Sequence, residues 1–304
     1  MKKSLLTVAL IVASMAASAQ VVEVASVNRI ATASPIAVDI ARMSPDGSFA
    51  IVSNYGDNTL SKVDLATGAV KAVAANGSIL DMAFSPNGQG FVFKRATTAQ
   101  NRLRYYSVET LDLTDGFTRT IAAPARHAAN YSVSTTGTLS INAGGRLQAM
   151  SMRGQAVKAA PSAVVGVNKG HLEVTMPDGT TKFIDPQGRG SYLWPTLSPD
   201  GTKIAYYCSY RGCFVCNLDG SDVRPLGYIH APRWLGNDIV IGCQDYDNGE
   251  YITSSSIVAA NLDGTIQTLT GSDVVALGPS ASADASKILF TTADGQLYVI
   301  NLKK

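Results

Sequence analysis

A short turn sequence recurs along the chain and constrains its fold more than any other feature. Its fullest form is Ser198-Pro199-Asp200-Gly201, in which proline presets φ and glycine tolerates a positive φ. An apolar run from Tyr192 to Leu197 precedes it, and three further short apolar or β-branched runs follow before Gly227. Tight turns separate these runs, so residues 192–227 predict four short antiparallel strands in a meander. A single meander cannot cover both of its faces, and it therefore requires neighbours of the same kind.

The same order of strands and turns recurs elsewhere in the chain. First-strand turns are plain at five positions and degenerate at a sixth: Ser44, Ser85, Ser134, Ser198, Ser282 and Gly236-Asn237. Neighbouring turns are mostly about forty to fifty residues apart, which is the period of four-stranded propeller blades. The sequence therefore predicts an all-β protein, a single β-propeller of four-stranded antiparallel blades.

The repeat also resembles a known family. The pattern Ser-Pro-Asp-Gly-x-x-Ile-Ala-Tyr at 198–206, with third strands that end at Asn217–Gly220 and Asn261–Gly264, is similar to the repeat of TolB-like β-propellers. It is clearest in residues 36–75, 192–227 and 273–302. The resemblance implies a six-bladed propeller and a bias towards protein–protein interaction in the bacterial envelope. It implies no activity, because the motif residues form turns and strand cores.

The number of blades depends on residues 128–189. Seven short strands fit this stretch: Tyr131–Val133, Leu139–Asn142, Leu147–Met152, Ala156–Ala159, Val164–Val167, Leu172–Thr175 and Lys182–Ile184. No clear first strand precedes the last three. Counting strands favours seven blades, one of them poor, over the six that the resemblance implies. Because residues 273–302 supply only three strands, we expect Val21–Ile30 to pair with the last blade and close the ring.

Residues 1–19 have the features of a secretory signal peptide. Lys2-Lys3 is a positive n-region, Leu5–Val12 is apolar, and Ala17-Ser18-Ala19 fits a cleavage site. The apolar run is too short to span a membrane, and no second one follows. No cysteine lies near the cleavage site, which argues against a lipoprotein. The sequence thus predicts one propeller domain over residues 20–304, without a transmembrane segment after cleavage, in the bacterial periplasm or secreted.

Composition and motifs exclude several classes of function. Of 304 residues 46% are hydrophobic and 16% are charged, so the chain is too apolar for disorder. The net charge is +2 and no run of Lys or Arg exceeds a pair, so nucleic acid is not an expected partner. No G-x-S-x-G, H-E-x-x-H or P-loop sequence occurs, and the three histidines are dispersed. We therefore expect no cofactor, with calcium as a weaker alternative.

Calcium is considered because of Asp245, Asp247 and Glu250. These acidic residues flank Asn248-Gly249, and a turn that brings several oxygen ligands together suits a hard cation. The surrounding sequence lacks the rest of an EF-hand loop. A solvated hairpin turn is the favoured interpretation, and a metal site remains the alternative.

The four cysteines permit a disulfide. Cys208 and Cys213 flank a short turn and could be cross-strand neighbours, and export would make the bond chemically possible. Cys213 and Cys216 are an odd number of residues apart in a predicted strand, so their side chains should point to opposite faces. Buried free thiols are favoured over a disulfide, and both are favoured over zinc.

Large amphipathic side chains mark the best candidate binding surface. They cluster at the starts of two first strands: Tyr192, Trp194, Tyr228, His230, Arg233 and Trp234. Tyr, Trp and Arg dominate binding energy at many interfaces. The alternative is that these aromatic rings fill the space between adjacent sheets. We expect Trp194 to be packed, and His230 and Arg233 to be exposed.

These features favour an exported propeller that binds a protein, peptide or glycan at one end of the ring and has no catalytic activity. The alternative is a secreted polysaccharide lyase or hydrolase, whose acid and base would have to come from a single polar cluster: His230, Arg233, Asp245 and Asp247. A purely structural ring with an apolar plug in its channel is a third possibility.

Overall fold

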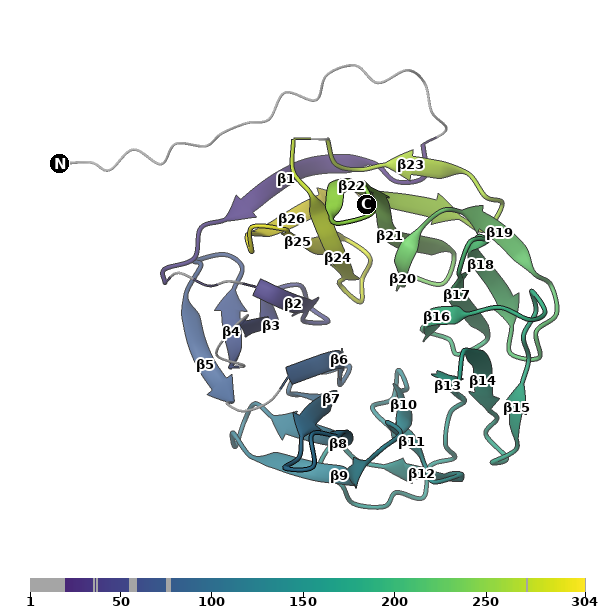
Figure 1. Cartoon of the computed structure of the whole chain (residues 1–304). Helices are drawn as coiled ribbons and strands as arrows, with labels where there is room; N and C mark the ends of the chain where they lie inside the picture. The colour runs from purple at the N-terminus through teal and green to yellow at the C-terminus, as the bar shows by residue number, and fades with distance from the viewer. Residues whose placement is uncertain are drawn as a thin grey trace.

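Seven antiparallel sheets surround a central axis as the blades of a propeller (Figure 1). The computed structural model describes residues 20–34, 36, 38–54, 59–74, 78–271 and 273–303. The prediction of an all-β propeller with seven blades is confirmed, and six blades are excluded. The predicted signal peptide, residues 1–19, lies outside the described residues. Within the described ranges, no helix has the length and apolar character needed to cross a membrane.

Each blade is built mainly from consecutive strands. Blade one contains β2 (Val38–Met43), β3 (Phe49–Asn54), β4 (Leu60–Asp64) and β5 (Val70–Ala74). Blade two contains β6 (Ser78–Phe84), β7 (Gly90–Thr98), β8 (Arg104–Asp112) and β9 (Thr118–Ala125). Blade three contains β10 (Asn130–Val133), β11 (Leu139–Ala143) and β12 (Arg146–Met150). Blade four contains β13 (Val164–Asn168), β14 (His171–Thr175) and β15 (Thr181–Phe183).

The last three blades complete the ring. Blade five contains β16 (Tyr192–Leu197), β17 (Lys203–Cys208), β18 (Gly212–Asn217) and β19 (Arg224–Gly227). Blade six contains β20 (His230–Leu235), β21 (Ile239–Asp247), β22 (Ile252–Asn261) and β23 (Ile266–Thr268). Blade seven contains β24 (Ala276–Ala281), β25 (Lys287–Thr292), β26 (Leu297–Leu302) and the N-terminal β1 (Val24–Ile30).

The recurrent turn is a small hydrogen-bonded unit. The Ser198 hydroxyl donates to Asp200 Oδ1 over 2.6 Å and accepts from the Lys203 amide over 3.0 Å. The turn glycine, Gly201, has φ +71°, a conformation that side chains other than glycine seldom adopt. Corresponding serine–aspartate bonds form at Ser44 and at Ser282. The sequence pattern thus fixes the reversal from the first to the second strand in several blades.

The two ends of the described chain meet in blade seven. β1 pairs antiparallel with β26 from Val24 opposite Leu302 to Ile30 opposite Leu297. The Lys303 amide adds a bond to the Glu23 carbonyl over 2.8 Å. The expected pairing of the N-terminal strand with the last blade is therefore present. It covers an edge of β26 that would otherwise be open.

Two blades differ from the predicted four-stranded form. Blade three lacks its outer strand, because Ala156–Ala159 forms only an isolated bridge between Met150 and Ala156. The prediction of a strand there is wrong. All four residues of Ala156–Ala159 are exposed, so no burial holds them in a regular ladder beside β12.

Blade four lacks its inner, first strand, as the sequence indicated. Its turn at Gly170 lies against the start of β16, because the Tyr192 amide donates to the Gly170 carbonyl over 3.0 Å. β13 therefore runs in the direction of a second strand, and no first strand precedes it. Residues 151–163 take the place of two consecutive strands, the outer one of blade three and the inner one of blade four.

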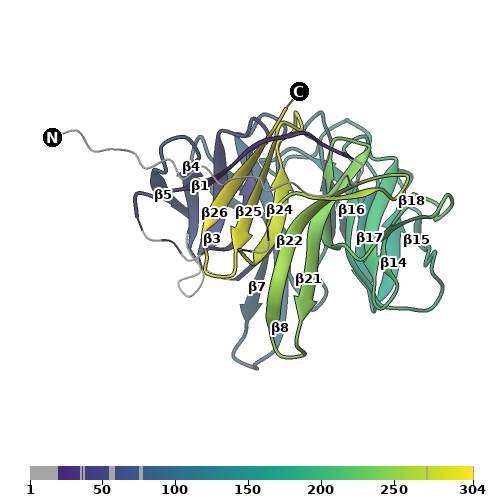
Figure 2. The same ribbon diagram turned by 90° about the horizontal axis from the view of Figure 1, so that it is seen from above.

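The ring has two different ends. The first-turn face carries the turns between first and second strands, such as Ser44–Gly47 and Ser198–Gly201. The hairpin face lies opposite and carries two long hairpins, β7–β8 and β21–β22, which project from the same side of the ring (Figure 2). The hydrophobic core lies between neighbouring blades, where Phe91, Tyr206 and Phe290 are fully buried. This packing holds the first strands at fixed positions around the channel.

Candidate functional site

The six predicted binding residues separate into buried and accessible groups. Tyr192 is fully buried, and its hydroxyl donates to the Gly188 carbonyl over 3.0 Å. Trp234 is also buried, and its Nε1 donates to the Thr196 carbonyl over 3.1 Å. These two support the fold between blades, which was the alternative interpretation for the aromatic residues. Tyr228 lies between β19 and β20 and is 59% exposed.

Trp194 is exposed, contrary to the expectation that it would be packed. Trp194 is 45% exposed at the hairpin face, and its backbone φ is +48°. The register of β16 shifts between Leu193 and Thr196, so a bulge turns this side chain out of the ladder. A large residue with positive φ is an outlier and costs on the order of 1–3 kcal/mol.

The same irregularity recurs in the next two first strands. Ala231 has φ +47° in β20 and Gly278 has φ +58° in β24, each within a register shift. The backbone geometry thus belongs to three neighbouring blades. Only blade five places a large aromatic ring on it.

Trp194 belongs to a small polar and aromatic cluster. Its ring centroid lies 5.8 Å from that of Tyr207 and 6.0 Å from that of His230. His230 Nδ1 lies 2.9 Å from Asp245 Oδ2, and Asp245 Oδ1 lies 2.5 Å from the Ser255 hydroxyl. This chain of contacts fixes the imidazole orientation beside the indole. His230 and Arg233 were expected to be exposed, but both are half-buried.

The two projecting hairpins carry opposite charges. Near the tip of β7–β8 lie Arg102 and Arg104, and Arg126 donates to the Arg104 carbonyl over 2.6 Å. The β21–β22 hairpin instead carries Asp247 and Glu250 near its tip. Exposed apolar or aromatic side chains accompany both sets of charges: Leu103, Tyr246, Tyr251 and Ile252. The hairpin face therefore has a basic and an acidic prominence, each with apolar area beside it.

The structure does not gather the predicted metal ligands. Asp245 is directed to His230 and Ser255, whereas Asp247 accepts from the Gly249 amide within the hairpin tip over 2.8 Å. Glu250 is exposed. Over the described part of the chain, no group of three or more His, Cys, Asp or Glu side chains is arranged to hold a metal ion. The hairpin turn, the favoured interpretation, matches these positions.

The four cysteines are buried free thiols, and the disulfide considered between Cys208 and Cys213 is not formed. Cys208 packs with Cys216 between blades four and five, whereas Cys213 packs on the other side of blade five against blade six. Cys213 and Cys216 thus lie on opposite faces, as their spacing predicted. Burial raises the pKa of both thiols to about 12, so both are neutral at pH 7.

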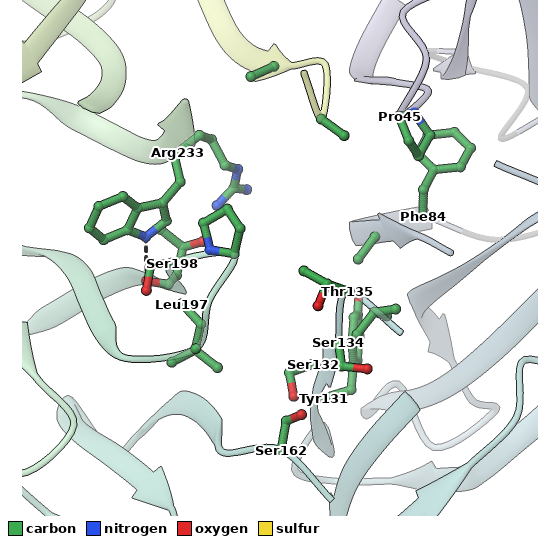
Figure 3. A pocket seen from close by; sticks show the side chains of 18 of the residues that line it. Pro45, Phe84, Tyr131, Ser132, Ser134, Thr135, Ser162, Leu197, Ser198 and Arg233 are labelled. Atoms are coloured by element: carbon green, nitrogen blue, oxygen red, sulfur yellow. Dashed lines mark hydrogen bonds between the residues drawn. The ribbon is translucent and has the colours of Figure 1, made fainter. Parts of the chain in front are cut away.

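A cavity of about 520 Å³ opens at the first-turn face of the channel. Six first strands contribute to its wall, and Ser162 and Val165 complete it where blade four has no first strand. Figure 3 shows Arg233 extending from β20 towards the open centre, with Tyr131 and Ser132 across the opening. The first-turn end of the channel is therefore open, and polar as well as apolar side chains line it.

The cavity contains a charged cluster that was not predicted from the sequence. Arg42 Nη2 lies 3.5 Å from Asp81 Oδ1, and Arg233 Nη2 lies 3.6 Å from the same oxygen. Burial, and then the charge of Arg233, lower the pKa of Arg42 to about 10. The available signal was a charged residue between apolar neighbours in each of three first strands. Of these three residues, only Arg233 was predicted from the sequence to belong to a site.

No family model matches the chain. A curated relative, the protein TolB homolog of Chlorobium luteolum, is 31% identical over 126 residues, which cover 38% of this chain and 28% of that relative. Among solved structures, TolB from Acinetobacter baumannii matches with a TM-score of 0.51 and 15% identity over 77% of this chain and 54% of its own. The putative TolB from Agrobacterium tumefaciens matches with a TM-score of 0.57 and 16% identity over 89% and 92% of the two chains. The fold is that of TolB-like β-propellers.

The chain covers a different share of the length of each of these three proteins. The chain spans less than a third of the Chlorobium protein and about half of the Acinetobacter structure, but most of the Agrobacterium structure. At such identities the solved structures show architecture alone. The surface that acts in this TolB-like propeller must be argued from its own residues.

Proposed function

We propose that the protein acts in the bacterial periplasm or outside the cell as a propeller that binds another protein, through the hairpin face, without catalysing a reaction. The observation that carries this proposal is Trp194, whose strained backbone presents a large ring to solvent at the channel entrance. Strain of this kind persists where the surrounding structure enforces it, and it concentrates at functional sites. Trp is also the residue type most enriched among interface hot spots.

The surroundings of Trp194 supply the rest of an interface. Tyr210 and Tyr228 are exposed on the same face, and their rings combine apolar area with a polar tip. The basic β7–β8 hairpin and the acidic β21–β22 hairpin stand on either side of the channel (Figures 1 and 2). A partner that fits this face carries an acidic patch and a basic patch with apolar residues between them. Complementary charges of this kind fix orientation and accelerate encounter.

The enzyme alternative lacks a converged acid and base. Of the four residues considered, only His230 and Asp245 contact one another. Arg233 is paired with Asp81 in the channel, and Asp247 lies in the hairpin tip. Asp245 is engaged by both His230 and Ser255, which suits a residue that orients an imidazole. Binding is therefore the function that this geometry supports best.

Site-specific photocrosslinking in the native cells tests the proposal. A benzophenone amino acid replaces Tyr210, Tyr228 or Tyr251 at the hairpin face, and Phe117 in the matched control. Phe117 is 65% exposed and lies in the turn before β9, at the opposite end of the ring. We expect protein adducts from the hairpin-face positions and none from Phe117. Equal adducts at all four positions, or none anywhere, would contradict a protein-binding hairpin face. An adduct with glycan alone would show that the face binds glycan and not protein.

Trp194→Gly separates a binding role from a structural one. Glycine relieves the backbone strain, and this offsets the lost ring contacts, so the free energy of unfolding should change by less than about 1 kcal/mol. Binding of the crosslinked partner should weaken at least about tenfold, as expected for a hot spot. A large loss of stability with unchanged partner binding would show that Trp194 serves the fold alone. Denaturation and affinity measurements on the purified partner provide both readouts.

A further inference from the structure

We propose that the cavity at the first-turn face is a binding site for a small ligand with a single carboxylate group, held by Arg42 and Arg233. This site lies at the other end of the channel from the proposed protein-binding face and does not depend on it. Its wall combines two guanidinium groups with apolar side chains from several blades: Met82, Phe84, Val133, Val165, Pro195 and Leu197. The volume of about 520 Å³ is in the range of small-molecule pockets.

The two arginines share one acid at distances too long for good hydrogen bonds. Both contacts to Asp81 Oδ1, at 3.5 and 3.6 Å, exceed the usual length of an N–H···O bond. Arg42 otherwise donates to its neighbour's carbonyl, at Ala41, over 2.9 Å, and its side chain is only 13% exposed. A guanidinium presents five donors, and leaving buried donors unpaired is costly. The pair therefore has hydrogen-bonding capacity that an incoming carboxylate can use.

Tyr131 supplies a second, independent observation. It lines the same cavity, and its buried hydroxyl has no hydrogen-bond partner among the described residues. The charges of Asp81, Arg42 and Arg233 all act on this hydroxyl, which places it beside the cluster. A phenol that remains protonated donates to a carboxylate, so Tyr131 can complete a three-sided set of donors.

The charge balance selects a monoanion. Four charged residues line the cavity, Arg42, Arg233, Asp81 and Asp200, and Lys94 lies behind them. Lys94 donates to Asn130 Oδ1 over 3.1 Å behind the cluster, and Asp200 is held by its own turn at the rim. In the inner cluster, two arginines face the single acid Asp81, so one positive charge is left uncompensated. A monocarboxylate neutralises it, whereas a phosphate dianion would leave a negative charge close to Asp81.

Two sources could supply such a carboxylate, a free organic acid or the C-terminus of a peptide. Isothermal titration of the full-length mature protein distinguishes them with hexanoate and with an N-acetylated tripeptide of apolar residues that has a free carboxyl end. Hexanamide and the amidated tripeptide are the uncharged controls, and inorganic phosphate is the anion control. We expect saturable binding of at least one carboxylate and at least tenfold weaker binding of its amide. The preferred source is the carboxylate that binds more tightly.

Matched variants assign the binding to the cluster. Arg233→Gln should weaken carboxylate binding by about ten- to a hundredfold, and Tyr131→Phe by about three- to tenfold. Arg119→Gln, which removes a cation paired with Asp115 on the surface, should leave binding unchanged. Asp81→Asn removes the competing acid and should tighten binding by about fivefold or more. A gain of affinity cannot arise from misfolding, so this variant keeps the test decisive if another variant folds poorly.

Several results would overturn the proposal. The first is that neither carboxylate binds saturably to the wild-type protein. The second is that an amide binds as tightly as its carboxylate, or that phosphate binds more tightly than either carboxylate. The third is that Arg233→Gln binds the carboxylate with unchanged affinity. The photocrosslinking outcome at the hairpin face has no bearing on any of them. Failure of one proposal can therefore be distinguished from failure of the other.

Discussion

Blades five and six contain four strands each, whereas the preceding blades three and four contain three each. In blades five and six, turns of a few residues join every strand to the next. In the incomplete pair, residues 151–163 run from the edge of blade three to the channel without forming a strand. The two missing strands are consecutive in the chain, so a single irregular segment accounts for both. A propeller can thus lose an outer and an inner strand at one place and remain a ring.

The incomplete pair compensates for its losses by close packing. The Asn130 side chain occupies the space beside Gly166, where an added Cβ would lie 2.0 Å from Asn130 Nδ2. The Ser132 hydroxyl donates to the Ala163 carbonyl over 2.7 Å, and the Ser162 amide donates to Ser140 Oγ over 2.7 Å. These bonds hold the irregular segment against blade three. They also leave Ser162 and Val165 in the wall of the cavity, where other blades present a first strand.

The largest expected difference between the two regions concerns their cores. Ile241 in blade six and Ile141 in blade three are both buried, so Ile→Ala makes a matched pair of substitutions. We expect Ile241→Ala to lower the free energy of unfolding by about 3–4 kcal/mol and Ile141→Ala by about 2 kcal/mol. The cluster around Ile141 has few fully buried members and can collapse more readily into the space created. Chemical denaturation measures both, and equal losses would contradict the comparison.

Hydrogen exchange should show an intermediate effect. β11 and β14 are central strands of three-stranded sheets, and β17 and β21 are central strands of four-stranded sheets, so all four have a neighbour on each side. We expect amides in β11 and β14 to be roughly ten- to a hundredfold less protected, because fewer contacts oppose local opening. Native-state exchange followed by mass spectrometry or NMR gives the protection factors. Uniform protection around the ring would mean that the missing strands do not weaken their blades.

The smallest effect is expected from the ion pair that ties the irregular segment to blade two. Arg153 Nε lies 3.1 Å from Asp112 Oδ2, and the arginine side chain is largely exposed. Arg153→Ala should lower the free energy of unfolding by less than about 1 kcal/mol. Bonds from Thr114, more than the contact with Arg153, lower the pKa of Asp112 to about 2. The pKa should therefore stay well below its ordinary value in the variant, which NMR titration can check.

The lowered pKa of Asp112 makes the contribution of this residue to stability depend on pH. Because the folded-state pKa of Asp112 is below its unfolded value of about 3.9, its contribution to stability is present above pH 4. The contribution is lost as the pH falls towards 2. If the pKa of Asp112 returned to its ordinary value in Arg153→Ala, the arginine, and not Thr114, would be the main cause of the lowered pKa.

Much of the fold could be predicted from sequence because its signals are local. The Ser-Pro-Asp-Gly turns at Ser44 and Ser198 fix their own hydrogen bonds, so the strands on either side follow from them. The absence of a first strand before Val164 was also readable, since no apolar run ends there in a turn of this type. Ala156–Ala159 was predicted wrongly because a short apolar run after a turn fits a strand, whereas in the structure all four residues are exposed and gain no burial from pairing.

The candidate site was less predictable because its geometry depends on distant parts of the chain. The exposure of Trp194 follows from a bulge with positive φ, a conformation that the identity of a tryptophan does not suggest. Arg42, Asp81 and Arg233 meet only because three first strands converge on one axis. Sequence patterns identify strands well, but which residues of seven different strands share a channel is a property of the closed ring.

The pairing of β1 with β26 also has a consequence for biosynthesis. The segment containing Val24 is made before blades one to six, whereas its partner around Leu302 is made after them. A nascent polypeptide interrupted anywhere before β26 leaves blade seven unfinished, however well the earlier blades have formed. Proteases and chaperones that recognise an unpaired sheet edge can therefore distinguish a truncated product from a finished one by the absence of the β1–β26 pairing.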